Sequence, residues 1–431
     1  MGAMDYYLNH DGGRIHFSLP ADWNLLSAKD CAKAPVVQDV AQEIERALSD
    51  PIGAAPLEKL ARAGMKVAVL FDDIQRATPA TLAVPAVLNR LNRAGVPDDR
   101  ITAICARGTH PAPTPQQLEK KVGKEVLQRL PGRVLIHDAQ SSENVFVGRT
   151  SRGTVVEINK DVAEADLVIG IGTCMPHPYS GFSGGCKILL PGVSSYRTIG
   201  EHHYSWLRNR SCKLSVLDGN MWYEESVEIA RLGGLAFKLD FLLNEVDQVI
   251  RAFAGDPVEE HREASKHATS LYQLFLPKEA DVVITSAAPL ELGVQATKSL
   301  LNARLAAKTG GTIIWVAAEK QPGPLMSLIE QMAAAQSAND YHRRLLRGDI
   351  PDSLKPFGIS FFMLGVPFKE ISEQYHVVHA TEGLSREQVE LMNFAYAPSL
   401  DAAIEQVRKG MPKADVTILP SGGTIIPVVK A

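Results

Sequence analysis

The chain has few cysteines, no strong excess of either charge and no long apolar run. Its five cysteines among 431 residues form no Cys-x-x-Cys pair, which argues against a disulfide framework or a cysteine-built zinc site and fits a reducing cytoplasm. A net charge of -4 gives no electrostatic basis for binding nucleic acid or an anionic membrane. No apolar run approaches the roughly 20 residues that cross a bilayer, and the first residues lack the pattern of a secretory signal. We therefore expect a cytoplasmic protein without a nucleic-acid or membrane partner.

What the sequence does contain is an alternation of short β-rich runs with longer helical stretches, which is typical of parallel sheets with crossover helices. The predicted strands are residues 67–71, 101–105, 134–137, 167–171, 282–285, 312–316, 359–364, 377–378 and 416–419. The predicted helices are residues 81–94, 116–129, 246–254, 259–275 and 293–306. Because the chain is too long for one ordinary core, we predict an α/β protein of two domains. Each is a mainly parallel sheet with flanking helices, and the active site lies in the cleft between them.

The predicted boundary between the domains lies near Pro277, where a helical stretch gives way to a second strand-and-helix pattern. Residues 1–276 form the predicted N-terminal, cofactor-binding domain, and we expect the C-terminal segment 412–431 to join it. Residues 277–411 form the predicted C-terminal α/β domain.

The most informative segment, residues 177–187, follows an apolar strand candidate and carries His177 and Lys187 around a glycine-rich bend. Glycine has no Cβ, so such a loop lets the backbone approach a ligand closely. Lys187 is a candidate phosphate ligand or nucleophile, the latter only in a setting that lowers its pKa. His203, beyond the bend, is a candidate metal ligand through a neutral imidazole nitrogen, and its neighbour His202 is the competing candidate.

Other polar groups follow predicted strands, where ligands bind in open α/β sheets. Asp73 and Arg76 follow the first strand, and their side chains suit ligand binding or, alternatively, helix capping and surface pairing. His110 follows the second strand, and with His177 it could form an acid/base pair. Gln295 and Lys298 are three residues apart on one face of a predicted helix, which is either ligand-facing or solvated.

Taken together and in order, these motifs resemble the nickel-dependent lactate racemase family. The matching motifs, which extend over most of the chain, are Asp73-x-x-Arg76 with Thr78-Pro79, Gly108-Thr109-His110, the segment from His177 to Lys187 with Pro191-Gly192, His203, and Gln295-x-x-Lys298. The segment from His177 to Lys187 is specific, whereas Asp-x-x-Arg alone would mean little.

The resemblance implies a nickel-pincer nucleotide cofactor, pyridinium-3,5-bisthiocarboxylic acid mononucleotide, which accessory biosynthesis proteins would supply. It implies that Lys187 links to this cofactor through a thioamide and that His203 completes the nickel coordination. Asp73, Thr78, Gly184 and Gly185 are the further residues expected at the cofactor.

The resemblance also implies a reaction, the inversion of C2 of a small-molecule 2-hydroxy acid by reversible hydride transfer to the cofactor. His110 and His177 would stand on opposite faces of C2 and handle the hydroxyl proton. Arg76, Gln295 and Lys298 would hold the substrate's carboxylate and other polar groups.

The sequence departs from the family pattern beside the predicted substrate site. Gln75 and Ala77 stand where the family commonly has Thr and Pro, and Pro111 replaces the basic residue expected after His110. A larger 2-hydroxy acid, including a sugar acid, is therefore a candidate beside lactate; its reaction would be a 2-epimerisation.

Two other functions compete with this interpretation. A dehydrogenase using soluble NAD would need a Gly-x-Gly-x-x-Gly turn, and Met175 stands where the third glycine after Gly170-x-Gly172 belongs. A non-catalytic small-molecule binding protein is the other alternative. The joint presence of His110, His177, Lys187 and His203 argues against it.

Overall fold

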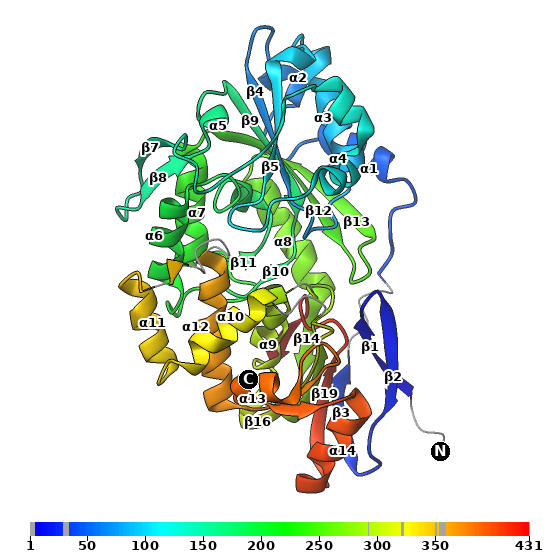
Figure 1. Ribbon diagram of the computed structural model, residues 1–431. Helices are drawn as coiled ribbons and strands as arrows, with labels where there is room; N and C mark the ends of the chain where they lie inside the picture. The colour runs from blue at the N-terminus through cyan, green and yellow to red at the C-terminus, as the bar shows by residue number, and fades with distance from the viewer. Residues whose placement is uncertain are drawn as a thin grey trace. The chain divides into compact units, whose positions relative to one another are not determined.

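A computed structural model describes residues 5–28, 34–291, 293–319, 323–349, 351–352 and 359–430. The chain forms two compact units, whose elements are labelled in Figure 1. We call Ala34–Ser270 the central unit, and Met1–Lys33 together with Leu271–Ala431 the terminal unit. No helix in the described part of the chain has the length and apolarity needed to span a membrane.

The central unit is built on a six-stranded sheet of order β13-β12-β9-β4-β5-β6. Its strands are β4 (Val67–Asp72), β5 (Ile101–Ala106), β6 (Val134–Ile136), β9 (Leu167–Thr173), β12 (Leu235–Leu243) and β13 (Val249–Gly255). All neighbouring pairs are parallel except β12 with β13. The predicted α/β class is therefore confirmed for this unit.

Helices cover this sheet, and smaller elements extend from it. The helical elements are α1 (Val40–Ser49), α2 (Leu57–Leu60), α3 (Ala80–Arg93), η2 (Asp98–Arg100), α4 (Pro115–Arg129), α5 (Lys160–Ala163), η3 (Gly185–Ile188), α6 (Tyr196–Trp206), α7 (Met221–Leu232) and α8 (Glu259–Tyr272). The antiparallel pairs outside the main sheet are β7 (Val145–Arg149) with β8 (Val155–Ile158) and β10 (Pro176–His177) with β11 (Gly181–Phe182).

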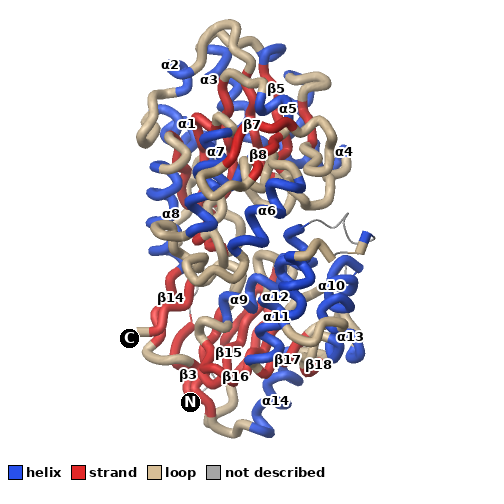
Figure 2. Tube along the Cα trace, turned by 90° about the vertical axis from the view of Figure 1, so that its left-hand side faces the viewer, coloured by secondary structure: helices blue, strands red, loops and turns tan. Residues whose placement is uncertain are grey.

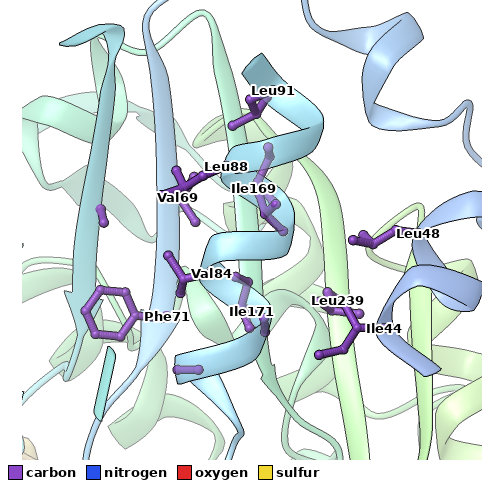
Figure 3. Close-up of a cluster of buried hydrophobic side chains, with 14 of the residues drawn as sticks. Ile44, Leu48, Val69, Phe71, Val84, Leu88, Leu91, Ile169, Ile171 and Leu239 are labelled. Carbon is purple, nitrogen blue, oxygen red and sulfur yellow. The ribbon is translucent and has the colours of Figure 1, made fainter. Parts of the chain in front are cut away.

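The main core of the central unit lies between one face of the sheet and helices α1, α3 and α4. Figure 3 shows Leu88 of α3 packed near Val69 of β4 and Ile169 of β9. These side chains are fully buried, as expected for parallel strands that are covered by helices and read as continuous apolar runs.

Leu88 gives a direct test of this packing. Leu88→Ala should lower the free energy of unfolding by about 2–5 kcal/mol, because it leaves a cavity in a close-packed core. Leu82 lies in the same helix with 44% of its surface exposed, so Leu82→Ala should change the free energy of unfolding by less than about 0.5 kcal/mol. Urea denaturation of both variants measures the difference, and equal midpoints would contradict this core.

The terminal unit contains a second six-stranded sheet of order β18-β17-β16-β15-β19-β3, in which every neighbouring pair is parallel. Its strands are β3 (Trp23–Ala28), β15 (Ala280–Ser286), β16 (Ala307–Val316), β17 (His376–Ala380), β18 (Ala395–Ala397) and β19 (Ala414–Leu419). Flanking helices, labelled beside the strands in Figure 2, are α9 (Thr297–Ala303), α10 (Gly323–Ala333), α11 (Ala338–Leu346), α12 (Ile359–Gln374), α13 (Arg386–Leu391) and α14 (Leu400–Gly410). The short helix η4 (Gly293–Ala296) precedes α9. The unit also has the hairpin of β1 (Asp5–His10) and β2 (Gly13–Ser18) and the parallel pair of β14 (Gln273–Leu276) and β20 (Ile426–Val429).

The observed units divide the chain differently from the predicted domains. β3, near the N-terminus, pairs with β19, which pairs in turn with β15. β3 and β19, one near each end of the chain, therefore share a sheet with strands that follow residue 277, and the segment 412–431 belongs to the terminal unit and does not join the central unit. The change of unit between Ser270 and Leu271 is the one part of the predicted division that agrees, since it lies close to the boundary predicted near Pro277.

Two predicted elements are wrong in type. The predicted strand at 359–364 belongs to helix α12, because a short continuous apolar run does not distinguish a buried strand from a buried helix. The predicted helix at 246–254 is largely strand β13, which pairs antiparallel with β12. The predicted helix at 259–275 ends at Tyr272, after which the chain enters β14.

Candidate active site

A pocket opens in the central unit where the carboxyl ends of β4, β5 and β9 meet the glycine-rich segment. Its lining includes Asp72, Asp73, Arg76, Arg107, Gly108, His110, Thr173, Gly184, Lys187, Pro191, Gly192 and Lys238. The loops that follow β4, β5 and β9, which carry Asp73, His110 and Lys187, thus share one site. Gln295 and Lys298 follow β15 in the terminal unit, so the predicted cleft between domains stays a prediction.

Asp73 and His110 contact each other in the pocket, with 2.5 Å between Asp73 Oδ2 and His110 Nδ1. Asp73 is buried, and burial alone would raise its pKa. His110, Arg76 and the backbone N–H of Gln75 more than offset burial and lower the pKa to about 2. Asp73 is therefore a carboxylate, and its Oδ2 accepts a hydrogen bond from Nδ1–H of His110. In the neutral ring the lone pair of His110 is then on Nε2.

Asp73 does not cap the following helix, which was the alternative role considered for it. Helix α3 begins at Ala80 with Pro79 as its N-cap and has no side-chain capping bond. The neighbouring Thr78 is buried, and its Oγ1 donates to Asp72 Oδ2 at 2.5 Å and lies 2.6 Å from Thr173 Oγ1. Thr78 thus ties the end of β4 to the end of β9 and stands behind the pocket lining.

The two glycines at the bend are required by close approach. Gly184 and Gly185 have φ values of +80° and +49°. A Cβ on Gly184 would lie 2.5 Å from Asp240 Oδ2, and one on Gly185 would lie 2.5 Å from His261 Cγ. Asp240 also accepts the backbone N–H of Gly185 at 2.5 Å, and this bond fixes the start of the turn that carries Lys187.

Lys187 lines the pocket in an environment that favours its neutral amine. Burial, and after it the positive charge of Arg76, lowers the pKa of Lys187 to about 7. Its Nζ lies 5.9 Å from the ring centroid of Trp222. An amine that is substantially unprotonated near neutral pH is the state that a lysine nucleophile requires.

Trp222 of α7 lies near three of the predicted site residues, Lys187, His177 and His203. The centroid of its indole lies 6.5 Å from the His177 ring and 4.4 Å from the His203 ring. His177 Nδ1 accepts the backbone N–H groups of Tyr179 and Ser180 at 3.3 and 3.2 Å, so the proton of its neutral ring is on Nε2. His177 is not among the residues that line the pocket, so its place at the substrate stays a prediction.

The histidine pair of α6 is buried. His202 Nε2 lies 3.1 Å from the carbonyl oxygen of Trp222, and its Nδ1 lies 3.2 Å from Nδ1 of His203. Burial lowers the pKa of His202 to about 4, against the opposing effect of Glu225. Both ring nitrogens of His202 face protein groups, which makes it a poor metal ligand, and the role of His203 stays a prediction. The described residues hold no group of three or more His, Cys, Asp or Glu side chains arranged for a metal.

Gln295 and Lys298 lie in the terminal unit, at the end of η4 and the start of α9. Both side chains are buried, so the alternative of a solvated helix face is wrong for them. Their predicted contact with substrate stays a prediction.

Three residues of this region have no role that was predicted from the sequence. Arg107 donates from Nε to the His137 carbonyl oxygen at 2.7 Å and also bonds the His110 carbonyl oxygen. Lys238, buried in β12, lines the pocket and pairs with Asp240. Trp222 is marked by no neighbouring motif, and only the fold brings it to the site.

Gly170 and Gly172 lie inside β9 and form no phosphate-binding turn. A Cβ on Gly170 would lie 2.8 Å from Lys238 Cδ, and one on Gly172 would lie 3.1 Å from Lys238 Nζ. These glycines make room for the buried side chain of Lys238. Gly170-x-Gly172, the part of the sequence most similar to an NAD-binding turn, is therefore part of a strand.

Comparison with known proteins gives one consistent family. The family model described as lactate racemase N-terminal domain matches residues 10–214, and the lactate racemase C-terminal domain model matches residues 276–427. The chain is 29% identical over 396 residues to the lactate racemase of Lactiplantibacillus plantarum, covering 89% of this chain and 90% of that protein. It is 30% identical over 285 residues to the lactate racemase of Thermoanaerobacterium thermosaccharolyticum, covering 65% and 66%.

Two solved structures share the fold. The lactate racemase apoprotein from Thermoanaerobacterium thermosaccharolyticum superposes with a TM-score of 0.85 at 24% identity, over 99% of this chain and all of that one. A protein from Thermotoga maritima superposes with a TM-score of 0.66 at 19% identity, over 91% and 98%. At these identities the structural likeness establishes the two-unit fold.

Proposed function

The chain belongs to the lactate racemase family, and from that premise we propose that it is a cytoplasmic isomerase that inverts C2 of a 2-hydroxy acid. The observation that carries the proposal is the pocket of the central unit. There an ionised Asp73 orients His110, and a lysine with a pKa of about 7 lies beside Arg76.

Inverting C2 by removing its proton is difficult, because the neighbouring carboxylate disfavours a carbanion. Oxidation of C2 to a 2-keto acid and reduction from the other face avoids that carbanion. His110 is oriented to take the hydroxyl proton, since Asp73 holds its Nδ1 proton and leaves the lone pair on Nε2. Asp73 then stabilises the imidazolium that forms.

His177 is proposed to serve the opposite face of C2. Its Nδ1 accepts two backbone N–H groups, so its neutral ring presents Nε2–H to the substrate oxygen. The two histidines would thus begin with complementary roles, one accepting a proton and the other donating a hydrogen bond. Arg76 offers a planar fork for the substrate carboxylate, and we propose that Gln295 and Lys298 contribute the remaining polar contacts.

The residues present fit a nickel-pincer nucleotide as the hydride carrier. Lys187 offers an amine that is about half neutral at pH 7 for a thioamide link, Gly184 lines the pocket beside it, Gly185 starts the turn that carries Lys187, and His203 would ligate nickel. Asp73 and Thr78 would support the cofactor side of the pocket. Reversible hydride acceptance is the chemistry that the bound cofactor would supply, while the protein positions the substrate and moves its proton.

We propose that the substrate is lactate or a larger 2-hydroxy acid such as a sugar acid. The names of the curated relatives favour lactate. The replacements Gln75, Ala77 and Pro111 favour a changed substrate pocket. A panel of single-enantiomer 2-hydroxy acids, from lactate to six-carbon sugar acids, ranks these candidates by kcat/KM.

The decisive experiment compares protein produced with and without the cofactor-biosynthesis proteins. Intact mass should show an added mass that maps to Lys187, and metal analysis should show bound nickel, only when those proteins are supplied. The same sample should convert one enantiomer or epimer into an equilibrium mixture without added NAD. A supplied sample that has neither adduct nor nickel would overturn the cofactor assignment, and activity that requires NAD would favour a dehydrogenase.

A further inference from the structure

Two adjacent histidines of α6, His202 and His203, face one another through their Nδ1 atoms at 3.2 Å. We propose that His202 is a positioning residue that holds His203 in the tautomer whose Nε2 carries the lone pair. The functional meaning of this inference rests on the proposed function, because Nε2 is the nitrogen that His203 would offer to nickel. Its structural content is independent of any bound metal.

The tautomer of His203 follows from the hydrogen-bond partners, taken one after another from Trp222 to His202 and then to His203. The carbonyl oxygen of Trp222 can only accept, so His202 Nε2, at 3.1 Å from it, carries the hydrogen. In a neutral His202 ring, Nδ1 is then the acceptor. The facing Nδ1 of His203 must supply the single hydrogen between the two rings. The lone pair of a neutral His203 is consequently on Nε2.

The surroundings of His202 favour its neutral ring. Its side chain is fully buried, and a charged imidazolium without full solvation is costly. The nearest carboxylate oxygen, Glu225 Oε2, is 4.0 Å from Nε2. Glu225 already accepts hydrogen bonds from Thr150 and Thr154 at 2.6 and 2.7 Å and from Trp206 Nε1.

Trp222 fixes both rings in space as well. Its indole meets the His202 ring edge-on at 5.1 Å and 88°, and the His203 ring at 4.4 Å and 62°. One residue therefore sets the orientation of His203 by packing and the hydrogen position of His202 by its carbonyl group. A partner that fixes the tautomer and ring orientation of a ligating histidine typically changes metal affinity by 10–100-fold.

The first test uses the protein without cofactor. Long-range ¹H–¹⁵N spectra of ¹⁵N-histidine-labelled protein report the tautomer of each ring, and His203→Gln assigns the signal. We expect His203 to be protonated at Nδ1 and unprotonated at Nε2. A His203 that is protonated at Nε2 with a bare Nδ1 would overturn the proposal, whatever the protein catalyses.

The second test measures nickel retention of the cofactor-loaded protein against a chelator. His202→Phe keeps an aromatic ring but removes the acceptor, and it should lose nickel at least about tenfold faster than wild type while keeping the mass adduct at Lys187. His202→Gln can accept from His203 and donate to Trp222, so it should retain nickel nearly as wild type does. His16→Phe, at an exposed histidine, is the matched control and should change nothing.

The outcomes separate this proposal from the proposed function. Nickel retention by His202→Phe equal to that of wild type would overturn the positioning role and leave the function intact. A wild-type sample that never binds nickel would overturn the cofactor assignment. The tautomer measurement would still decide whether His203 donates from Nδ1 to His202. If His202→Phe does not fold, nickel retention by His202→Gln and the His203 tautomer in wild-type spectra still test the positioning role.

Discussion

His110→Ala and His177→Ala should each lower the rate of C2 inversion by roughly 10²–10⁴-fold, the usual contribution of a positioned acid or base. His110→Ala removes the Nε2 lone pair that Asp73 orients. His177→Ala removes the Nε2–H that two backbone N–H groups set in place. Rates of conversion from each pure enantiomer, followed by chiral chromatography, measure the loss in both directions.

Both variants should keep the cofactor, because neither ring is assigned to hold it. Nickel content and the intact-mass adduct at Lys187 should therefore match wild type, so that lost activity reports on proton handling alone. His16→Ala, at an exposed histidine of the terminal unit, is the control for removing a ring. Normal turnover in either His110→Ala or His177→Ala would contradict the acid/base assignment, and loss of nickel from either would assign that histidine to the cofactor.

The sequence predicted which loops of the central unit come together, because the signals for those loops are local. A buried strand that ends in a polar or glycine-rich loop is visible in a few consecutive residues, and parallel strands bring their carboxyl ends to one edge. Asp73, His110 and Lys187 reach the same pocket for that reason. Spacing alone did not decide whether these side chains bind a ligand or serve as helix caps and surface groups. The roles predicted for them come from the resemblance to a family.

What the sequence could not supply is set by contacts between distant residues. The pairing of β3 with β19 joins segments almost 400 residues apart, and nothing in either strand specifies its partner. The apolar run at 359–364 has no period that separates helix from strand. Trp222 and His202 acquire their roles only through packing between α6 and α7.

Lys187 should be the residue on which cofactor attachment depends. Lys187→Arg keeps a positive charge, but a guanidinium stays protonated at all accessible pH values, so it should show no mass adduct and no activity above background. Intact mass and peptide mapping of protein made with the biosynthesis proteins measure this directly. An adduct on the Lys187→Arg protein would mean that the linkage forms elsewhere.

The lowered pKa of Lys187 gives a second, activity-independent measure in protein without cofactor. A group with a pKa of about 7 is mostly protonated at pH 6 and mostly neutral at pH 8. Its trace acetylation rate should therefore rise through pH 7 and level off near pH 8, whereas ordinary lysines titrate near 10.4 and continue to gain reactivity through pH 9. Exposed Lys124 is the reference within the same sample. The plateau depends on protonation alone, so slow access of the reagent to a buried amine lowers the whole curve without moving its midpoint. A rate at Lys187 that keeps rising through pH 9 would show that this amine is charged at neutral pH and unable to act as the proposed nucleophile.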